Sequence, residues 1–284
     1  MTLVVTGATG HLGRLVIDSL LASGTPAAEI TATGRTPEKL AQLAALGVRT
    51  AQASFEDPAA LEAAFAGADT VLLISGNEVG QRVRQHTNAI EAAVKAGVGR
   101  IVYTSVLGGD PEKLVLAPEH VATEQAILAS GLPYTILRNG WYNENYAQAL
   151  AQAAATGAVI GSAGDGRVAS ASRRDYAEAA AAVLAGTGHE NKTYELSGDT
   201  AWDQQEFAKV LTEVTGREVA YRDLSPEEHL AALVGAGLDE GTAGFLTALD
   251  AGIRDGALEL ATGDLSRLLG RPTTPLADTL RELS

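Results

Sequence analysis

The sequence predicts an α/β fold in which a doubly wound parallel sheet carries a second, smaller, mainly helical lobe. Two observations predict the sheet. Short β-branched runs alternate with Ala- and Leu-rich helical stretches from residue 1 to about residue 138, and several of these runs are almost continuously apolar. A strand that is apolar throughout suits a parallel sheet covered by helices on both faces. Repeated strand–helix units then require right-handed crossovers, which build a doubly wound sheet.

The first 138 residues are the predicted nucleotide-binding domain. We expect its strands at 2–6, 29–33, 48–53, 70–74, 100–104 and 134–138. Ala- and Leu-rich stretches between the strands predict helices near 12–22, 37–46, 58–65, 81–96 and 119–130.

Residues 139–284 form the predicted smaller substrate lobe. A helical stretch at 143–155 leads into the Gly-rich segment 157–175. A helix at 175–185 and a short strand at 192–198 follow, and parts of 168–200 are expected to return to the main sheet. Amphipathic helices dominate the rest of the chain, over 202–216, 225–237 and 240–253.

The composition restricts the classes of function. The chain has 35 acidic and 21 basic residues, a formal net charge of −14, and no run of Lys or Arg, so nucleic acid is not expected as a partner. It has no cysteine, which excludes thiol chemistry and leaves redox chemistry to a bound cofactor. A strand-like run begins at residue 2 and no apolar run reaches membrane-spanning length, so we expect a cytoplasmic protein without a membrane partner. A homo-oligomer is compatible with the sequence.

A glycine loop joins the first expected strand to the first helix. It reads Gly7-Ala8-Thr9-Gly10-His11-Leu12-Gly13. Glycine permits a tight turn and a close approach of the backbone to a pyrophosphate, and the free N–H groups at the helix start bind the anion. A glycine-rich turn without a ligand is the alternative. The position after the first strand of a repeated βα array favours a dinucleotide-binding Rossmann sheet.

Arg35 follows the second expected strand. An NAD-type site usually carries Asp or Glu there to hold the ribose 2′-hydroxyl, whereas this chain reads Thr33-Gly34-Arg35-Thr36-Pro37, with Lys39 close behind. A guanidinium binds a 2′-phosphate through charge-assisted hydrogen bonds, and a carboxylate would repel it. The sequence therefore predicts NADP(H) in preference to NAD(H). The alternative is that Arg35 only decorates the next helix.

Six segments of the chain match the motifs of a known enzyme family. They are VTGATGHLG (5–13), LLISGNEVGQR (72–82), YTSVL (103–107), LRNGWYNENY (137–146), GDGRVASASRRDYA (164–177) and LLGRPTTPLADTL (268–280). Through them the chain resembles the NmrA-like atypical short-chain dehydrogenase/reductases, and among these the bacterial type-2 NAD(P)H:quinone oxidoreductases. The resemblance covers essentially the whole chain. The first segment is shared widely among reductases, and the fourth and fifth are more specific to the quinone reductases.

The resemblance implies a set of cofactor contacts. The cofactor would lie over the glycine loop with its 2′-phosphate at Arg35, and Arg173 would approach it from the smaller lobe. Ser75, Gly76 and Asn77 would line its phosphate and ribose; they follow the fourth strand, at the sheet edge where open α/β sheets bind ligands. The nicotinamide side would be wrapped by Asn139, Gly140, Trp141, Tyr142, Asn143 and Glu144.

Aromatic residues are concentrated in the segment NGWYNENY, although the chain is only 5% aromatic. Trp141, Tyr142 and Tyr146 are the candidate substrate contacts, because flat rings beside a nicotinamide favour a flat acceptor such as a quinone. The alternative is that these rings fill the joint between the two lobes.

The catalytic pair usual on this scaffold is missing. Alcohol and ketone chemistry normally uses Tyr-x-x-x-Lys, in which the lysine lowers the pKa of the phenol. At the expected helix the chain reads His120-Val-Ala-Thr-Glu124, and a carboxylate disfavours phenol ionisation. His120 and the strand-end Ser105 remain as catalytic candidates. The alternative for His120 is pairing with Glu124 on an exposed helix face. No third ligand lies nearby, so no metal is expected.

These observations favour an NADPH-dependent reductase of quinones or similar planar, electron-poor acceptors. Hydride would pass directly from nicotinamide C4 to a stacked acceptor, and solvent would supply the proton. A non-catalytic NADP(H)-binding redox sensor of the NmrA type is the alternative, because the fold alone does not decide function. A reductase of dyes or other xenobiotics would share the first mechanism.

Overall fold

The main sheet has seven strands in the order β3-β2-β1-β4-β5-β6-β8 in a computed structural model that describes residues 1–284. Parallel pairing joins each neighbouring pair from β3 to β6. The predicted doubly wound Rossmann fold is confirmed. The strands are β1 (Leu3–Val5), β2 (Ile30–Gly34), β3 (Arg49–Gln52), β4 (Thr70–Leu73), β5 (Arg100–Val106), β6 (Tyr134–Asn139) and β8 (Lys192–Leu196).

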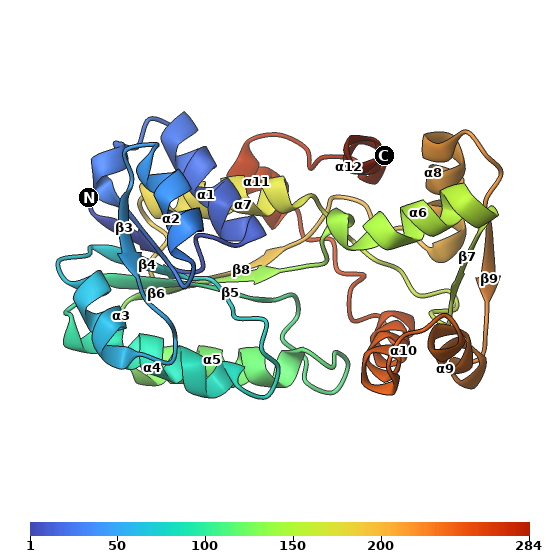
Figure 1. Cartoon of the computed structure of the whole chain (residues 1–284), viewed down its shortest axis with the longest axis horizontal. Coiled ribbons are helices and arrows are strands. Elements are labelled where there is room, and N and C mark those ends of the chain that lie inside the picture. The colour runs from blue at the N-terminus through green and yellow to red at the C-terminus, as the bar shows by residue number, and fades with distance from the viewer. The chain divides into compact units, whose positions relative to one another are not determined.

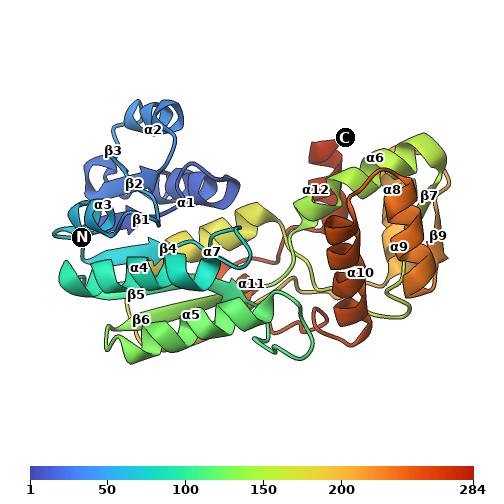
Figure 2. The same cartoon turned by 60° about the horizontal axis from the view of Figure 1, so that its bottom comes forward.

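Helices cover both faces of this sheet (Figures 1 and 2). One face carries α1 (His11–Ala22), α2 (Pro37–Ala44) and α7 (Arg173–Ala185), and the other carries α3 (Pro58–Phe65), α4 (Arg82–Lys95) and α5 (Ala117–Ala129). Proline at the first position starts α2 and α3, since its missing N–H is not needed there. Asp57 also caps α3 by accepting from the backbone N–H of Ala60 at 3.0 Å.

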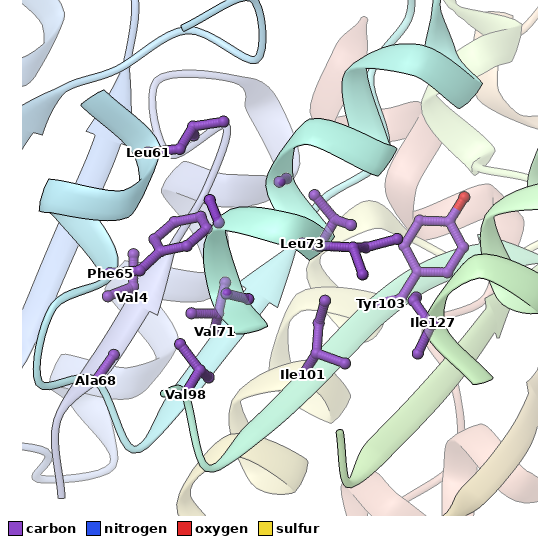
Figure 3. Packing of buried hydrophobic residues seen from close by; sticks show 14 of the residues in the cluster. Val4, Leu61, Phe65, Ala68, Val71, Leu73, Val98, Ile101, Tyr103 and Ile127 are labelled. Carbon is purple, nitrogen blue, oxygen red and sulfur yellow. The ribbon is translucent and has the colours of Figure 1, made fainter. Parts of the chain in front are cut away.

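A hydrophobic core lies between the sheet and helices α3 to α5 (Figure 3). Strand residues Val71, Leu73 and Ile101 pack there with Phe65 of α3 and Ile127 of α5, and each is at most 1% exposed. Burial of such a side chain contributes about 1.5–3 kcal/mol to the free energy of unfolding. This packing accounts for the apolar segments 71–73 of β4 and 101–103 of β5.

The chain divides into two units, each described here by itself. The first contains Met1–Val106, Glu119–Asn139 and Arg173–Glu195, and the second contains Leu107–Pro118, Gly140–Ser172 and Leu196–Ser284. Helix α7 therefore belongs to the first unit, and β8 forms one edge of the main sheet. Two hydrogen bonds align β8 with β6, from Asn191 N to Tyr134 O at 2.6 Å and from Gly140 N to Leu196 O at 2.7 Å.

The second unit contains helices and one small two-stranded sheet. The sequence did not predict this sheet. Strand β7 (Ala158–Gly161) pairs in parallel with β9 (Ala220–Asp223). Each has only four residues, which is too short for a clear period-two pattern. The helical elements are η2 (Asn143–Tyr146), α6 (Ala147–Thr156), α8 (Gln204–Thr215), α9 (Pro226–Gly235), α10 (Glu240–Arg254), α11 (Asp264–Leu269) and α12 (Leu276–Leu283), and a further short turn, η1 (Ala27–Glu29), precedes β2 in the first unit. None of the helices combines the length and the apolar character that crossing a membrane requires.

Candidate functional site: a nucleotide-binding edge of the sheet

The carboxyl ends of β1 and β4 form the switch point of the sheet, because the strand order reverses between these neighbours. The loop after β4 is hydrogen-bonded to Thr6, which follows β1, and to Thr104 of β5. The backbone N–H of Ile74 donates to Thr6 Oγ1 at 3.0 Å, and that of Ser75 donates to Thr104 Oγ1 at 2.9 Å. Open α/β sheets bind ligands in this crevice. The predicted cofactor segments 7–13 and 75–77 thus lie side by side at this edge.

The glycine loop has the backbone geometry of an anion site. Gly7 adopts φ +58°, in the left-handed region that favours glycine. A Cβ on Gly13 would lie 2.4 Å from the carbonyl oxygen of Gly7, so a side chain there would force helix α1 away from the loop. Gly10 caps α1 without a side-chain hydrogen bond, and the first turn contains no acidic residue. The helix start therefore suits a pyrophosphate.

A cavity of about 430 Å³ opens beside this loop. Three of its lining residues are cationic and none is acidic, so it can receive a phosphate-bearing ligand. The expectation that Arg173 approaches from the smaller lobe is wrong, because Arg173 starts α7 in the first unit, where it shares the cavity with the glycine loop. Sequence reasoning missed Arg14, although it lies one helical turn after Gly10. The lining residues are Ala8, Thr9, Gly10, His11, Arg14, Leu15, Lys39, Gln42, Leu43 and Arg173.

Arg35 lies directly after β2 and is exposed over 67% of its side chain. A Cβ on the preceding Gly34 would lie 2.7 Å from Thr9 Cγ2, so the end of β2 fits closely against the glycine loop. The guanidinium is not free, because Arg35 Nη1 contacts Glu78 Oε1 at 2.7 Å. Glu78 comes from the loop between β4 and α4, and sequence reasoning did not identify this partner.

Both backbone polar groups of Gly76 are hydrogen-bonded to side chains of α4. Its N–H donates to His86 Nε2 at 3.0 Å, and its carbonyl accepts from Arg82 Nε at 2.8 Å. Burial lowers the pKa of His86 from 6.5 to about 3, so the ring is neutral and Nε2 is the acceptor. The other ring nitrogen, Nδ1, lies 3.0 Å from Thr123 Oγ1. The predicted cofactor loop 75–77 is therefore fixed by α4 and α5.

His120 and Glu124 do not form an exposed pair, and that expectation is wrong. His120 is 7% exposed and Glu124 is 6% exposed, because this face of α5 packs on the sheet. His120 Nδ1 lies 2.8 Å from the hydroxyl of Tyr103. Burial lowers the pKa of His120 to about 3, which leaves it neutral near pH 7 and argues against proton donation. No group of three His, Cys, Asp or Glu residues is arranged to hold a metal ion.

Ser105 and Glu124 belong to a buried ionic network instead. Ser105 Oγ donates to Glu124 Oε1 at 2.5 Å. Arg138 donates to both oxygens of Glu124, at 2.9 and 2.7 Å, and to Glu195 at 2.8 Å. The paired carboxylates raise the pKa of Arg138 above its usual value. Because the hydroxyl hydrogen of Ser105 is already donated, its predicted catalytic role would require breaking this bond.

The remaining predicted residues divide between the units. Asn139 ends β6 in the first unit, whereas Gly140, Trp141, Tyr142, Asn143 and Glu144 lie in the second, and their contact with a cofactor stays a prediction. The two segments most specific to the quinone reductases pair with each other. Asn143 N donates to Ala171 O at 2.9 Å, and Ala171 N donates to Trp141 O at 3.0 Å.

Tyr146 belongs to an aromatic cluster of the second unit. Its ring centroid is 5.1 Å from that of Trp202 and 4.7 Å from that of Phe207. Burial raises the pKa of its phenol well above the ordinary value. The Tyr146 ring thus packs against rings of its own unit, and contact of Trp141, Tyr142 and Tyr146 with an acceptor stays a prediction.

The fold and the glycine loop define a dinucleotide-binding protein of the Rossmann class. A family model described as NAD(P)H-binding matches residues 7–187, more than half of the chain. The chain belongs to this NAD(P)H-binding family.

Two relatives make the assignment more specific. Quinone oxidoreductase 2 of Escherichia coli is 48% identical over 281 residues, covering 99% of this chain and 98% of the relative. The E. coli NADPH-dependent quinone oxidoreductase complexed with NADPH superposes with a TM-score of 0.96 over 99% of both chains. The Citrobacter triphenylmethane reductase complexed with NADP(H) is 39% identical, with a TM-score of 0.95 over 100% of both chains. The resemblance to the type-2 quinone oxidoreductases is confirmed.

Proposed function

We propose that this chain is an NADPH-dependent oxidoreductase that reduces quinones or similar planar, electron-poor acceptors by direct hydride transfer. The proposal is carried by the contrast between a nucleotide cavity lined by cationic residues and a catalytic-pair position filled by two buried side chains that already bond other protein groups. The E. coli relative is described as a quinone oxidoreductase, and the Citrobacter relative is named as a triphenylmethane reductase, which supports electron-poor aromatic acceptors.

The residues of the first unit fit a phosphorylated dinucleotide. The glycine loop 7–13 receives the pyrophosphate at the start of α1, and Arg173 adds positive charge on the same cavity. Arg35 takes the 2′-phosphate, as its position after β2 suggests. Loop residues Ser75 to Asn77, fixed by His86 and Arg82, line the ribose side.

The chemistry needs positioning more than acid catalysis. The bound nicotinamide supplies a hydride, which carries two electrons and one proton to the acceptor. The reduced acceptor is then a hydroquinone anion, and it takes its second proton from solvent. Tyr103 and His120 stay bonded to each other, and Glu124 stays ionically paired with Arg138. Trp141 and Tyr142 stack on the flat acceptor in this proposal.

One assay tests this function. NADPH and NADH oxidation are measured with and without a simple benzoquinone at matched protein concentration. We expect oxidation that depends on the acceptor and is faster with NADPH at subsaturating cofactor. Tight NADPH binding without acceptor-dependent oxidation would instead support a redox sensor of the NmrA type.

A further inference from the structure

Arg35 is linked to a fixed chain of charged and amide groups. Its partner Glu78 accepts from Arg35 Nη1 at 2.7 Å through Oε1 and from Gln85 Nε2 at 2.9 Å through Oε2. Gln85 Nε2 also donates to Glu56 Oε1 at 2.8 Å, and Glu56 is held in turn by Arg84. The buried Gln85, 4% exposed, anchors this chain on helix α4.

Glu78 is therefore a positioned anion and not a freely moving surface side chain. Each of its carboxylate oxygens has its own donor, one of them the buried Gln85. These hydrogen bonds, first from Gln85 and then from Arg35, hold the pKa of Glu78 below its ordinary value. The carboxylate is consequently charged at neutral pH, and it contacts the guanidinium of Arg35 directly after β2.

We propose that Glu78 is a specificity-determining residue. Its carboxylate competes with the 2′-phosphate of NADPH for Arg35 and repels it, which reduces the ratio of NADPH affinity to NADH affinity. This inference rests on the proposed function, in which Arg35 reads the 2′-position. A 2′-phosphate carries between one and two negative charges at neutral pH. It must displace Glu78 from Arg35 and then remain close to the displaced carboxylate. The 2′-hydroxyl of NADH is uncharged and leaves the Arg35–Glu78 pair intact.

In this chain the residue that contacts the ribose 2′-position and the carboxylate that adjusts its affinity follow different strands of the sheet. In NAD-type sites the carboxylate follows the second strand, whereas here the guanidinium follows β2 and the carboxylate comes from the loop after β4. A loop-borne carboxylate tunes the affinity for the phosphate without replacing the residue that binds it.

The test compares two carboxylate-to-amide variants of the same ionic chain. Dissociation constants for NADPH and NADH are measured by titration calorimetry without acceptor, so quinone turnover does not enter. Glu78→Gln is expected to tighten NADPH binding about fivefold and to change NADH binding less than about twofold, because an exposed ion pair contributes about 1 kcal/mol at most. High salt should reduce the gain, since it screens exposed charges.

Glu56→Gln is the matched control, because it removes the same charge from the same chain without contacting Arg35. We expect it to change NADPH affinity less than about twofold. The inference is overturned if Glu78→Gln leaves NADPH affinity unchanged, if it tightens the binding of both cofactors equally, or if Glu56→Gln tightens NADPH binding to the same extent.

A parallel Arg35→Asp variant separates failure of the role of Glu78 from failure of the assignment of Arg35 as the residue that binds the 2′-phosphate. If Arg35→Asp selectively weakens NADPH but Glu78→Gln has no effect, only the role of Glu78 fails. If Arg35→Asp weakens both cofactors equally, the assignment of Arg35 fails, and this inference fails with it.

Discussion

The glycine-loop region and the α5 region use their polar groups in opposite ways. At the glycine loop, the start of α1 has no side-chain cap, and Arg14, Lys39 and Arg173 line an open cavity. At α5, Glu124 is buried and bonded by both Ser105 and Arg138. The uncapped backbone N–H groups at the start of α1 can still bind a ligand, whereas the bonded and buried polar groups of α5 stabilise the fold.

The largest expected effect comes from breaking the buried network. Arg138→Met leaves the Glu124 carboxylate buried without its guanidinium, so we expect a loss of about 3 kcal/mol in the free energy of unfolding. Urea unfolding measures it. Arg35→Met is the control, because its ion pair with Glu78 is exposed and should change stability by less than about 1 kcal/mol. Equal losses of unfolding free energy in Arg138→Met and Arg35→Met would show that the α5 network stabilises the fold no more than the exposed ion pair does.

Arg35→Asp should act on cofactor binding and hardly on stability. A carboxylate at this position repels the 2′-phosphate, so we expect the dissociation constant for NADPH to rise about a hundredfold. NADH binding should be unchanged or tighter. Calorimetric titration of both cofactors checks this expectation, and an equal loss of affinity for both would show that Arg35 does not read the phosphate.

Acidification should weaken the α4–α5 side of the first unit. The pKa values of His86 and His120 are lowered from 6.5 to about 3 by burial. Between these values the unfolded chain binds more protons than the folded chain, so the stabilising contribution is complete above pH 6.5 and falls as the pH drops toward 3. We expect each histidine to remove about 1 kcal/mol per pH unit in this range.

Unfolding free energies at pH 7 and pH 5.5 test this dependence. The His86→Gln variant should show a shallower loss, because glutamine does not titrate and its amide oxygen can still accept from Gly76 N–H. A wild-type stability that is flat or rises on acidification would contradict the neutral assignment of both rings.

The sequence was sufficient for the features that depend on local patterns. The strands of the main sheet were predicted because continuous apolar runs and glycine turns are local signals, and the glycine loop was located for the same reason. The β7–β9 sheet was missed because four-residue strands give no clear period. The i,i+4 spacing of His120 and Glu124 placed them on one helix face but did not say which face of α5 is buried.

Long-range partners were beyond local reasoning. Arg35 and Glu78 are 43 residues apart in the chain, and Arg138 and Glu195 are 57 residues apart. Both pairs form because the sheet topology brings their elements together, and their side chains then reach across. The sequence could indicate that Arg35 is cationic and lies at the end of the second strand, but not that its guanidinium is paired with Glu78.

The central claim is that quinone reduction in this chain needs no side-chain proton donor. The most direct test is the turnover number for benzoquinone with saturating NADPH in the double variant Ser105→Ala, His120→Gln, measured on protein whose NADPH affinity is unchanged. The account predicts a turnover number within about threefold of the wild type, because general acid catalysis contributes about a hundredfold or more where it operates. A loss of about a hundredfold at unchanged NADPH affinity would contradict it.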